Sequence, residues 1–271
     1  MIRVAILGAA GRMGQALIRC IGASCDLQLS AAIEQAGHAR LGADAGVTAG
    51  IPPLGIPITA DFSAVKPSDV MIDFTFHQTV PNNARQAAEW KIPMIIGTTG
   101  LLDIETAVVQ KSASITPIVW APNMSLGVNL LFALVERSAG ILGFAYRTSV
   151  DETHHVHKKD APSGTALRLA EKIAQGRGQD LHQVLVHRPE GTGDIPKDET
   201  AITVQSFRQG EVVGDHTVRF ENAGEMIELT HHLESRDALA MGALHAARWI
   251  IGKPPRLYDM QDVLGLTAVL E

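Results

Sequence analysis

The densest group of reactive side chains lies in the segment 151–166, which reads DETHHVHKKDAPSGTA. Three of the chain's 11 histidines fall within four positions of this segment, and Lys158 and Lys159 follow them directly. An imidazole exchanges protons near neutral pH, and lysine side chains attract carboxylates. The segment therefore predicts a site for an anionic substrate in which a histidine transfers a proton.

The sequence Ser-Gly-Thr opens a predicted helix over 163–173. Free backbone amides and hydroxyls at this end form an anion site suited to a carboxylate. If the strand that precedes the segment continues through it, His155 and His157 share one face of that strand and His154 lies on the other.

Two other interpretations of the histidine-rich segment stay open. A zinc site needs spaced His, Cys or carboxylate ligands, and the adjacent lysines repel a cation. A purely structural polar strand end needs no ligand at all. The pair His231–His232 could join the segment across a sheet, although a partly exposed strand end is the favoured interpretation of that pair.

A glycine-rich turn, GAAGRMG at residues 8–14, joins a predicted strand to a predicted helix. Gly8 permits a tight turn, Gly11 lets the backbone approach a pyrophosphate, and Gly14 lets the helix pack closely on the strand. The spacing is G-x-x-G-x-x-G, with Ala10 where the usual motif has its second glycine. A strand before the turn and a helix after it favour a dinucleotide site.

Glu34 supports the same interpretation from the end of the second predicted strand. It stands 20 residues after Gly14, where a carboxylate accepts the ribose hydroxyls of a dinucleotide. The alternative is a solvated acid at a strand end. Two further turns, at 97–100 and 121–124, follow later strands and either line a nicotinamide pocket or are turns only.

Short apolar strands alternate with helices over the first 125 residues, which predicts an α/β domain with a Rossmann-like parallel sheet and helices on both faces. The strands are expected at 1–7, 27–33, 70–74, 93–97 and 116–120, and helices at 12–21 and 80–90. Later residues predict a second, α+β domain with a mixed or antiparallel sheet. Its elements are expected as a helix at 128–139, strands at 145–153, 201–207, 212–220 and 226–232, and a polar loop at 188–194, before a last helix at 239–251.

The 271 residues are 46% hydrophobic and 19% charged, which excludes the disordered and fibrous classes. A net charge of −6 without a long basic run argues against binding to nucleic acid or an anionic membrane. No apolar stretch is expected to span a bilayer, and the first residues lack a signal-peptide pattern, so a cytoplasmic protein is expected. The spacing of Cys20 and Cys25 is typical of neither a metal site nor a thioredoxin motif.

With these motifs assembled, the sequence resembles the 4-hydroxy-tetrahydrodipicolinate reductase family, also called dihydrodipicolinate reductases, of diaminopimelate and lysine biosynthesis. The resemblance covers essentially the whole chain, and its most specific motif is ETHHVHKKDAPSGTA at 152–166. The glycine turn, GTTG at 97–100 and APNM at 121–124 stand in the expected order.

The resemblance implies a nicotinamide-binding domain at 1–125 and 236–271 and a substrate domain at 126–235 that also builds a homotetramer. It implies hydride transfer from reduced nicotinamide to C4 of the dihydropyridine formed from a small cyclic dicarboxylate, without a metal. His154 matches the family's proton donor and Lys158 its second catalytic acid. The positions matched to substrate binding are His155, Ser163, Gly164 and Thr165. Those matched to cofactor binding are Gly8, Ala9, Ala10, Gly11, Arg12, Met13, Glu34, Gln35, Gly97, Thr98, Thr99, Ala121, Pro122, Asn123 and Met124.

The sequence departs from many relatives at Gln35, where they carry an arginine that can pair with a 2′-phosphate. Gln35 has no charge, and Glu34 repels the phosphate. We therefore expect NADH to be preferred, with NADPH as a possible second cofactor. Arg40 is near enough in sequence to offer a substitute charge.

Two other functions are consistent with part of the pattern. Another nicotinamide-dependent dehydrogenase of aspartate-derived metabolites would share the first domain but would not need the segment 154–165. A non-catalytic dinucleotide sensor would bind cofactor and tolerate the loss of His154 and Lys158.

Overall fold

The computed structural model describes residues 1–189 and 198–266, and it divides into two compact units. Unit 1 comprises Met1–Leu126 and Arg236–Leu264. Unit 2 comprises Gly127–Ser235 and the described part of the segment that begins at Gly265. Each unit has its own sheet and its own hydrophobic core.

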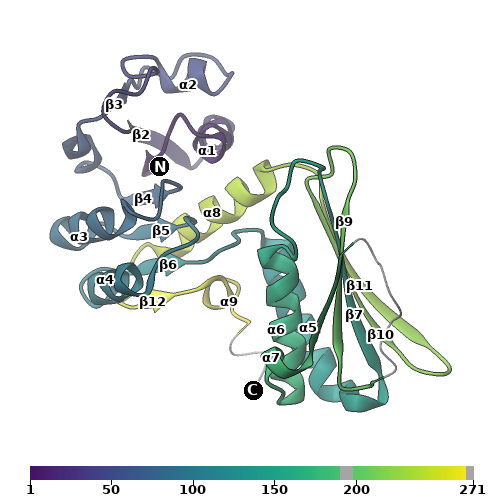
Figure 1. Ribbon diagram of the computed structural model, residues 1–271. Helices are drawn as coiled ribbons and strands as arrows, with labels where there is room; N and C mark the ends of the chain where they lie inside the picture. The colour runs from purple at the N-terminus through teal and green to yellow at the C-terminus, as the bar shows by residue number, and fades with distance from the viewer. Residues whose placement is uncertain (190–197, 267–271) are drawn as a thin grey trace. The chain divides into compact units, whose positions relative to one another are not determined.

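Unit 1 contains a seven-stranded sheet with the order β12-β6-β5-β4-β1-β2-β3, and its paired strands are all parallel (Figure 1). The strands are β1 Ile2–Leu7, β2 Leu27–Ile33, β3 Ile58–Thr59, β4 Val70–Asp73, β5 Met94–Ile96, β6 Ile118–Trp120 and β12 Leu257–Tyr258. The helices are α1 Arg12–Gly22, α2 Ala45–Thr48, η1 Phe62–Val65, α3 Val80–Trp90, α4 Asp103–Ala113, α8 Asp237–Ile250 and α9 Met260–Val263.

The alternation of side chains along β1 builds two hydrophobic cores in unit 1. Val4 and Ile6 pack with residues of α1 and α8, whereas Ala5 and Leu7 pack with residues of α3 and α4. Successive side chains of a strand point to opposite faces, so helices must cover both faces of this sheet. The predicted Rossmann-like architecture is confirmed.

Unit 2 contains a five-stranded mixed sheet with the order β11-β10-β7-β9-β8. The central strand β7 pairs in parallel with β9 and antiparallel with β10. The strands are β7 Arg147–His154, β8 Leu185–Pro189, β9 Ile202–Arg208, β10 Gly214–Glu221 and β11 Met226–Leu233. The helices are α5 Leu126–Leu142, η2 Gly143–Ala145, α6 Gly164–Arg177 and α7 Leu181–Val184. The predicted second α+β domain with a mixed sheet is confirmed.

One face of this sheet carries both the core of unit 2 and its polar cluster. Val150 of β7 packs in the core with residues of α5 and α6. Glu152 and His154 follow at intervals of two, so they lie on the same buried face. The apolar packing that orders the strand therefore also orders the two polar side chains at its end.

The structure differs from two expectations, one on membrane-spanning stretches and one on the loop at 188–194. Leu126–Ala145 forms a 20-residue helical stretch with a mean hydropathy of 1.4, which by length and composition can cross a membrane, so the expectation that no stretch is long enough is wrong. The core helix of a soluble protein passes the same test, and 39% of this stretch is buried inside the structure. Of the predicted loop at 188–194, the first two residues belong to β8 and the rest lies outside the described residues.

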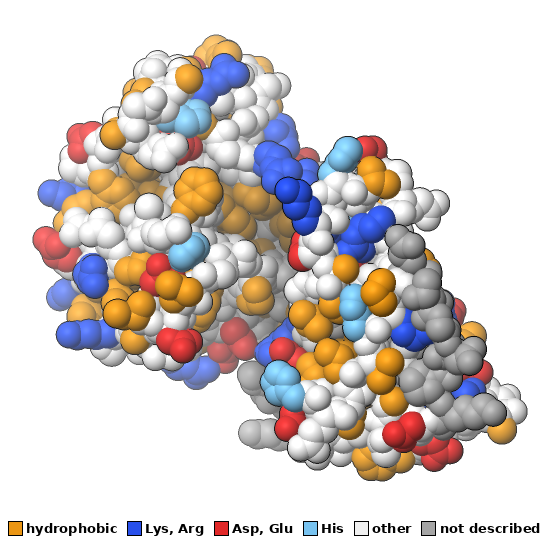
Figure 2. Space-filling model, viewed as in Figure 1, with side chains coloured by type: hydrophobic (Ala, Val, Ile, Leu, Met, Phe, Trp, Pro, Cys, Tyr) orange, Lys and Arg blue, Asp and Glu red, His pale blue; other side chains and the backbone are white. Residues whose placement is uncertain are grey.

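Acidic, basic and apolar side chains are interspersed on the visible face of each unit (Figure 2). This mixed surface agrees with the modest net charge of −6. A strong electrostatic attraction for polyanions needs basic side chains gathered on one face.

Candidate active site

A pocket of about 840 Å³ opens at the carboxyl ends of strands β1, β2, β4 and β5 in unit 1. Ligands of open parallel sheets bind at this edge, where the strands end and loops begin. Ten of the predicted cofactor residues line it, namely Gly8, Ala10, Gly11, Arg12, Met13, Glu34, Gln35, Gly97, Thr98 and Thr99.

The glycine turn has the backbone geometry that its sequence predicts. Gly8 has a φ of +79°, and a Cβ there would lie 2.6 Å from the carbonyl oxygen of Phe74. A Cβ on Gly14 would lie 2.2 Å from the carbonyl oxygen of Gly8. Both positions therefore need glycine. Because Gly11 precedes α1 and has no side chain to cap it, the first amides of α1 are available to an anion.

Glu34 ties the end of β2 to the glycine turn. Its Oε2 accepts a hydrogen bond of 3.1 Å from the amide of Ala10, and its Oε1 accepts one of 2.9 Å from the amide of Gln35. Each carboxylate oxygen accepts more than one hydrogen bond, so Glu34 can still receive a ribose hydroxyl.

Five of the predicted cofactor residues are not among the described residues that line this pocket. Ala9 is buried, and Ala121 and Met124 pack in the core of unit 1, while Pro122 and Asn123 belong to the turn after β6. Their role in cofactor binding stays a prediction. Sequence reasoning overlooked the lining segment Phe74–His77, together with His38 and Thr79. The carboxyl end of the predicted strand at 70–74 was the signal that points to this segment.

The carboxylate of Asp73 is fully buried and links three segments around this pocket by hydrogen bonds. It accepts hydrogen bonds from the amide and the hydroxyl of Thr75, from the side-chain amide of Asn83 and from the hydroxyl of Thr98. Burial raises the pKa of Asp73, while the hydrogen bonds act in the opposite direction. The carboxylate thus joins β4 to α3 and to the turn that carries Thr98.

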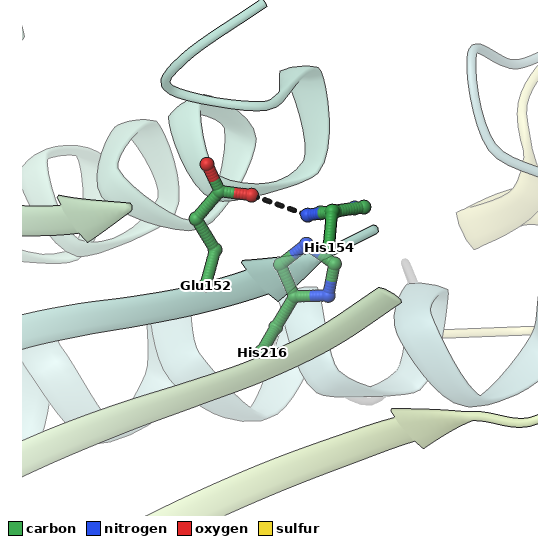
Figure 3. Close-up of side chains that lie close together, drawn as sticks. All are labelled: Glu152, His154 and His216. Atoms are coloured by element: carbon green, nitrogen blue, oxygen red, sulfur yellow. Dashed lines mark ion pairs between the residues drawn. The ribbon is translucent and has the colours of Figure 1, made fainter. Parts of the chain in front are cut away.

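Unit 2 carries a second cluster, formed by Glu152 and His154 of β7 and His216 of β10 (Figure 3). The Oε2 atom of Glu152 forms an ion pair of 2.5 Å with Nδ1 of His154. The ring of His216 meets that of His154 edge-on, with centroids 5.2 Å apart. All three side chains are buried.

The carboxylate of Glu152 is ionised although it is inaccessible to solvent. Burial opposes ionisation, but hydrogen bonds from His154 and Ser206 and the charge of Arg208 outweigh it and lower the pKa of Glu152 to about 2. Burial, followed by the charge of His154, lowers the pKa of His216 to about 3, so His216 is a neutral imidazole.

Ser163 connects this cluster to the start of α6. It is the N-cap of α6, and its hydroxyl accepts a hydrogen bond of 3.2 Å from the amide of Ala166. Its own amide donates to Oε1 of Glu152 at 3.1 Å, and its hydroxyl lies 3.3 Å from Nε2 of His216. The predicted helix start at residue 163 is confirmed.

Of the other predicted substrate residues, His155 directly follows β7, and Gly164 and Thr165 are the first residues of α6. His155 and Thr165 are half-buried, and Gly164 is exposed. Lys158 forms an ion pair of 2.7 Å with Asp160. The strand ends at His154, so the expected alternation of His155 and His157 on a continued strand does not occur.

The second histidine pair divides between two environments. His231 lies opposite His216 in the register of β10 and β11, and their ring centroids are 6.4 Å apart. His232 forms an ion pair with Asp215 and is largely exposed. One member of the pair therefore extends the buried histidine cluster, as the sequence had allowed.

The geometry of Glu152, His154 and His216 favours an ion pair over a metal site, although their ligand atoms lie within 4.8 Å of one another. A zinc ion sits about 2.0–2.2 Å from each ligand. The Oε2 and Nδ1 atoms are 2.5 Å apart, too close to bind one ion tetrahedrally without moving. Arg208 already contacts the other carboxylate oxygen at 3.3 Å.

Comparison with known proteins decides the family. A model described as "Dihydrodipicolinate reductase, N-terminus" matches residues 2–124, and one described as "Dihydrodipicolinate reductase, C-terminus" matches residues 127–264. The chain belongs to the dihydrodipicolinate reductase family. The family comprises NAD(P)H-dependent oxidoreductases of lysine and diaminopimelate biosynthesis, as the resemblance implied.

Individual relatives agree with this assignment. The chain is 47% identical over 268 residues to 4-hydroxy-tetrahydrodipicolinate reductase of Anaeromyxobacter sp. (strain Fw109-5), with 98% of each chain covered. It is 46% identical to the same enzyme of Syntrophotalea carbinolica, with 98% of this chain and 100% of that one covered. The fold is similar to that of the dipicolinate-bound dihydrodipicolinate reductase from Paenisporosarcina sp. TG-14, with a TM-score of 0.73, 22% identity and coverage of 96% and 97%.

Substitution of Asp73 by Asn should remove a pH-dependent loss of stability from unit 1. Because the pKa of Asp73 is raised, its contribution to folding is complete below the usual aspartate range and declines as the pH rises through the raised value. The free energy of unfolding of Asp73→Asn relative to wild type should therefore increase between about pH 4 and pH 8.

Tryptophan fluorescence during urea unfolding measures this difference in unit 1, because Trp90, Trp120 and Trp249 all lie there. A difference that stays constant across the pH range contradicts the raised pKa.

Proposed function

We propose that this reductase converts the dihydropyridine derived from 4-hydroxy-tetrahydrodipicolinate to tetrahydrodipicolinate, and that His154 is its proton donor. The residues of the glycine turn and Glu34 would hold a reduced nicotinamide dinucleotide, which would supply the hydride for C4 of the conjugated imine. A proton from the His154 imidazolium neutralises the electron density that the hydride brings. The observation that carries this proposal is the buried pair of Glu152 and His154, because a carboxylate 2.5 Å from Nδ1 orients the imidazole of the proposed donor.

The start of α6 suits the carboxylates of the substrate. The proposal places them against the amides of Gly164 and Thr165 and near Ser163 and His155. A Cβ on Gly164 would meet no described heavy atom within 4 Å, so the approach to this helix end is open. The solved reductase from Paenisporosarcina holds dipicolinate, a planar dicarboxylate, which makes that compound a suitable probe of this chain.

Lys158 is proposed as the second catalytic acid. Its ammonium pairs with Asp160, whose carboxylate is exposed to solvent and can be exchanged for that of a ligand. In contact with substrate, Lys158 attracts a carboxylate or assists loss of the hydroxyl group as water. Lys159 is exposed, and we propose no catalytic role for it.

The predicted domain at 1–125 and 236–271, which contains most of unit 1, is proposed to bind the cofactor, and the predicted substrate domain at 126–235 is proposed to bind the dicarboxylate. The free amides at the start of α1 suit the pyrophosphate. Gln35 and His38 line the pocket beside Glu34, whereas Arg40 is not among its described lining residues. Arg12 is the basic side chain among the described lining residues, and neither Glu34 nor Gln35 at the end of β2 offers a positive charge to a 2′-phosphate. The pocket therefore favours NADH over NADPH.

Replacement of His154 by Gln should reduce kcat by about a hundredfold to ten-thousandfold, the usual contribution of a general acid, with little change in KM. Lys158→Ala should also lower kcat strongly, and Lys159→Ala is the matched control with a small effect. Absorbance of the reduced cofactor, followed with enzymatically generated substrate, measures all three variants. Near-normal turnover of His154→Gln contradicts the proposal, and equal losses in the two lysine variants indicate general electrostatics.

The wild-type chain should have a higher kcat/KM with NADH than with NADPH, and Gln35→Arg should shift the ratio towards NADPH by about 10-fold or more, as expected for a new charged hydrogen bond. Gln35→Ala controls for the loss of glutamine alone. Equal or better efficiency of the wild type with NADPH contradicts the preference.

A homotetramer in the cytoplasm is the proposed working form. Unit 2 exposes apolar side chains that an interface would cover, including Leu130, Leu134 and Ile141 of α5 and Met226 of β11. Sedimentation velocity should give four times the chain mass of 28.9 kDa. A stable monomer at micromolar concentration contradicts the assembly.

A further inference from the structure

We propose that Glu152 is a positioning residue that fixes the tautomer of His154 and, through Arg208, holds the turn that carries Lys158. The inference rests on the proposed role of His154 as proton donor. The inference assigns a function to the buried carboxylate of Glu152 and the half-buried guanidinium of Arg208, which the reaction itself leaves unexplained.

The charge of Glu152 is costly to bury. Its side chain is 0% exposed, and an ionised carboxylate in such a place is strongly destabilising unless it is paired and hydrogen-bonded. Oε1 accepts hydrogen bonds from the amide of Ser163 and the guanidinium of Arg208, and Oε2 forms an ion pair with His154. The carboxylate is therefore fixed in place from both sides.

Glu152 determines which ring nitrogen of neutral His154 carries the proton. An ionised carboxylate only accepts hydrogen bonds, so neutral His154 must carry its proton on Nδ1, the atom 2.5 Å from Glu152. Nε2 then holds the lone pair, and it gains the proton that the imidazolium can donate. In Glu152→Gln the side-chain amide can instead donate a hydrogen bond to Nδ1, and neutral His154 then carries its proton on Nε2.

The backbone of Gly214 lies beside Nε2 of His154. A Cβ on Gly214 would lie 3.1 Å from Nε2, so a larger residue at that position would crowd this side of the ring. The neighbouring His216 is neutral and directs its own Nε2 to Ser163. His216 therefore lies against His154 without competing with it for the carboxylate of Glu152.

Arg208 of β9 connects Glu152 to the turn that carries Lys158. Its guanidinium contacts Oε1 of Glu152 at 3.3 Å and also donates to the carbonyl oxygens of Lys158 at 3.3 Å and Asp160 at 2.5 Å. The register of β9 against β7 pairs Arg208 with His154. One carboxylate thus connects the proton donor, the Lys158 turn and the start of α6.

The test compares Glu152→Gln with Asp151→Asn, which removes a carboxylate from the adjacent residue of β7 on the opposite face, where Asp151 pairs with Arg219. Glu152→Gln should lower kcat about 10- to 100-fold, the range expected for one hydrogen bond to a charged group. The dissociation constants for dipicolinate and NADH should change less than about threefold, since the glutamine oxygen still accepts from Ser163. Asp151→Asn should keep its kcat within about threefold of wild type.

A second readout does not depend on activity. Long-range ¹⁵N–¹H NMR spectra of histidine-labelled protein, assigned with the His154→Gln variant, report which ring nitrogen is protonated. Neutral His154 should carry its proton on Nδ1 in the wild type and in Asp151→Asn, and on Nε2 at least in part in Glu152→Gln.

Three results overturn the inference. One is a wild-type spectrum with the proton on Nε2 of His154, a result that does not depend on the folding of Glu152→Gln. Another is a Glu152→Gln variant with normal kcat. The third is a loss of kcat with the Nδ1 tautomer unchanged, which indicates a merely structural acid. If His154→Gln retains normal turnover, the proposed function fails instead, and the tautomer readout still reports on Glu152.

Discussion

The carboxylate of Glu152 is the constraint on which the polar end of unit 2 depends. It is buried and ionised, and burial of such a charge is tolerated only with a full set of partners. Those partners come from β7, β9 and the start of α6, three segments that the mixed sheet and its helices bring to one place. The requirement to satisfy one charge thus fixes the position of His154 relative to the helix end where a dicarboxylate is proposed to bind.

Unit 1 uses the same physical device at the end of its parallel sheet. Asp73 is buried at the end of β4, and its hydrogen bonds to Thr75, Asn83 and Thr98 join the segments around the cofactor pocket. The two carboxylates differ in one respect. Glu152 has an arginine and a histidine beside it and its pKa is lowered, whereas Asp73 has only neutral donors and its pKa is raised. The charged partners of Glu152 favour its ionised form, whereas burial among neutral donors favours the protonated form of Asp73.

Much of this arrangement follows from local sequence. The alternation of short apolar strands with helices over the first 125 residues predicted the parallel sheet, and the glycines at 8 and 14 predicted the tight turn, because each signal lies in a short stretch of sequence. The two-residue strands β3 and β12 were missed, since they are too short to show a period. Arg208 and His216 were missed for a different reason: each reaches the cluster through pairing with β7, more than 50 residues away, and local patterns do not encode strand register.

The family of the chain follows from its similarity to known reductases, whereas the arrangement of its proposed catalytic groups depends on the buried charge of Glu152. Crystal structures of the wild type and of Glu152→Gln, each with dipicolinate bound, test that dependence most directly. We expect the variant to show a shifted His154 ring and a displaced backbone at 158–160, with the sheet and the start of α6 unchanged. A variant in which the ring and that turn superimpose on the wild type contradicts the central role of the carboxylate.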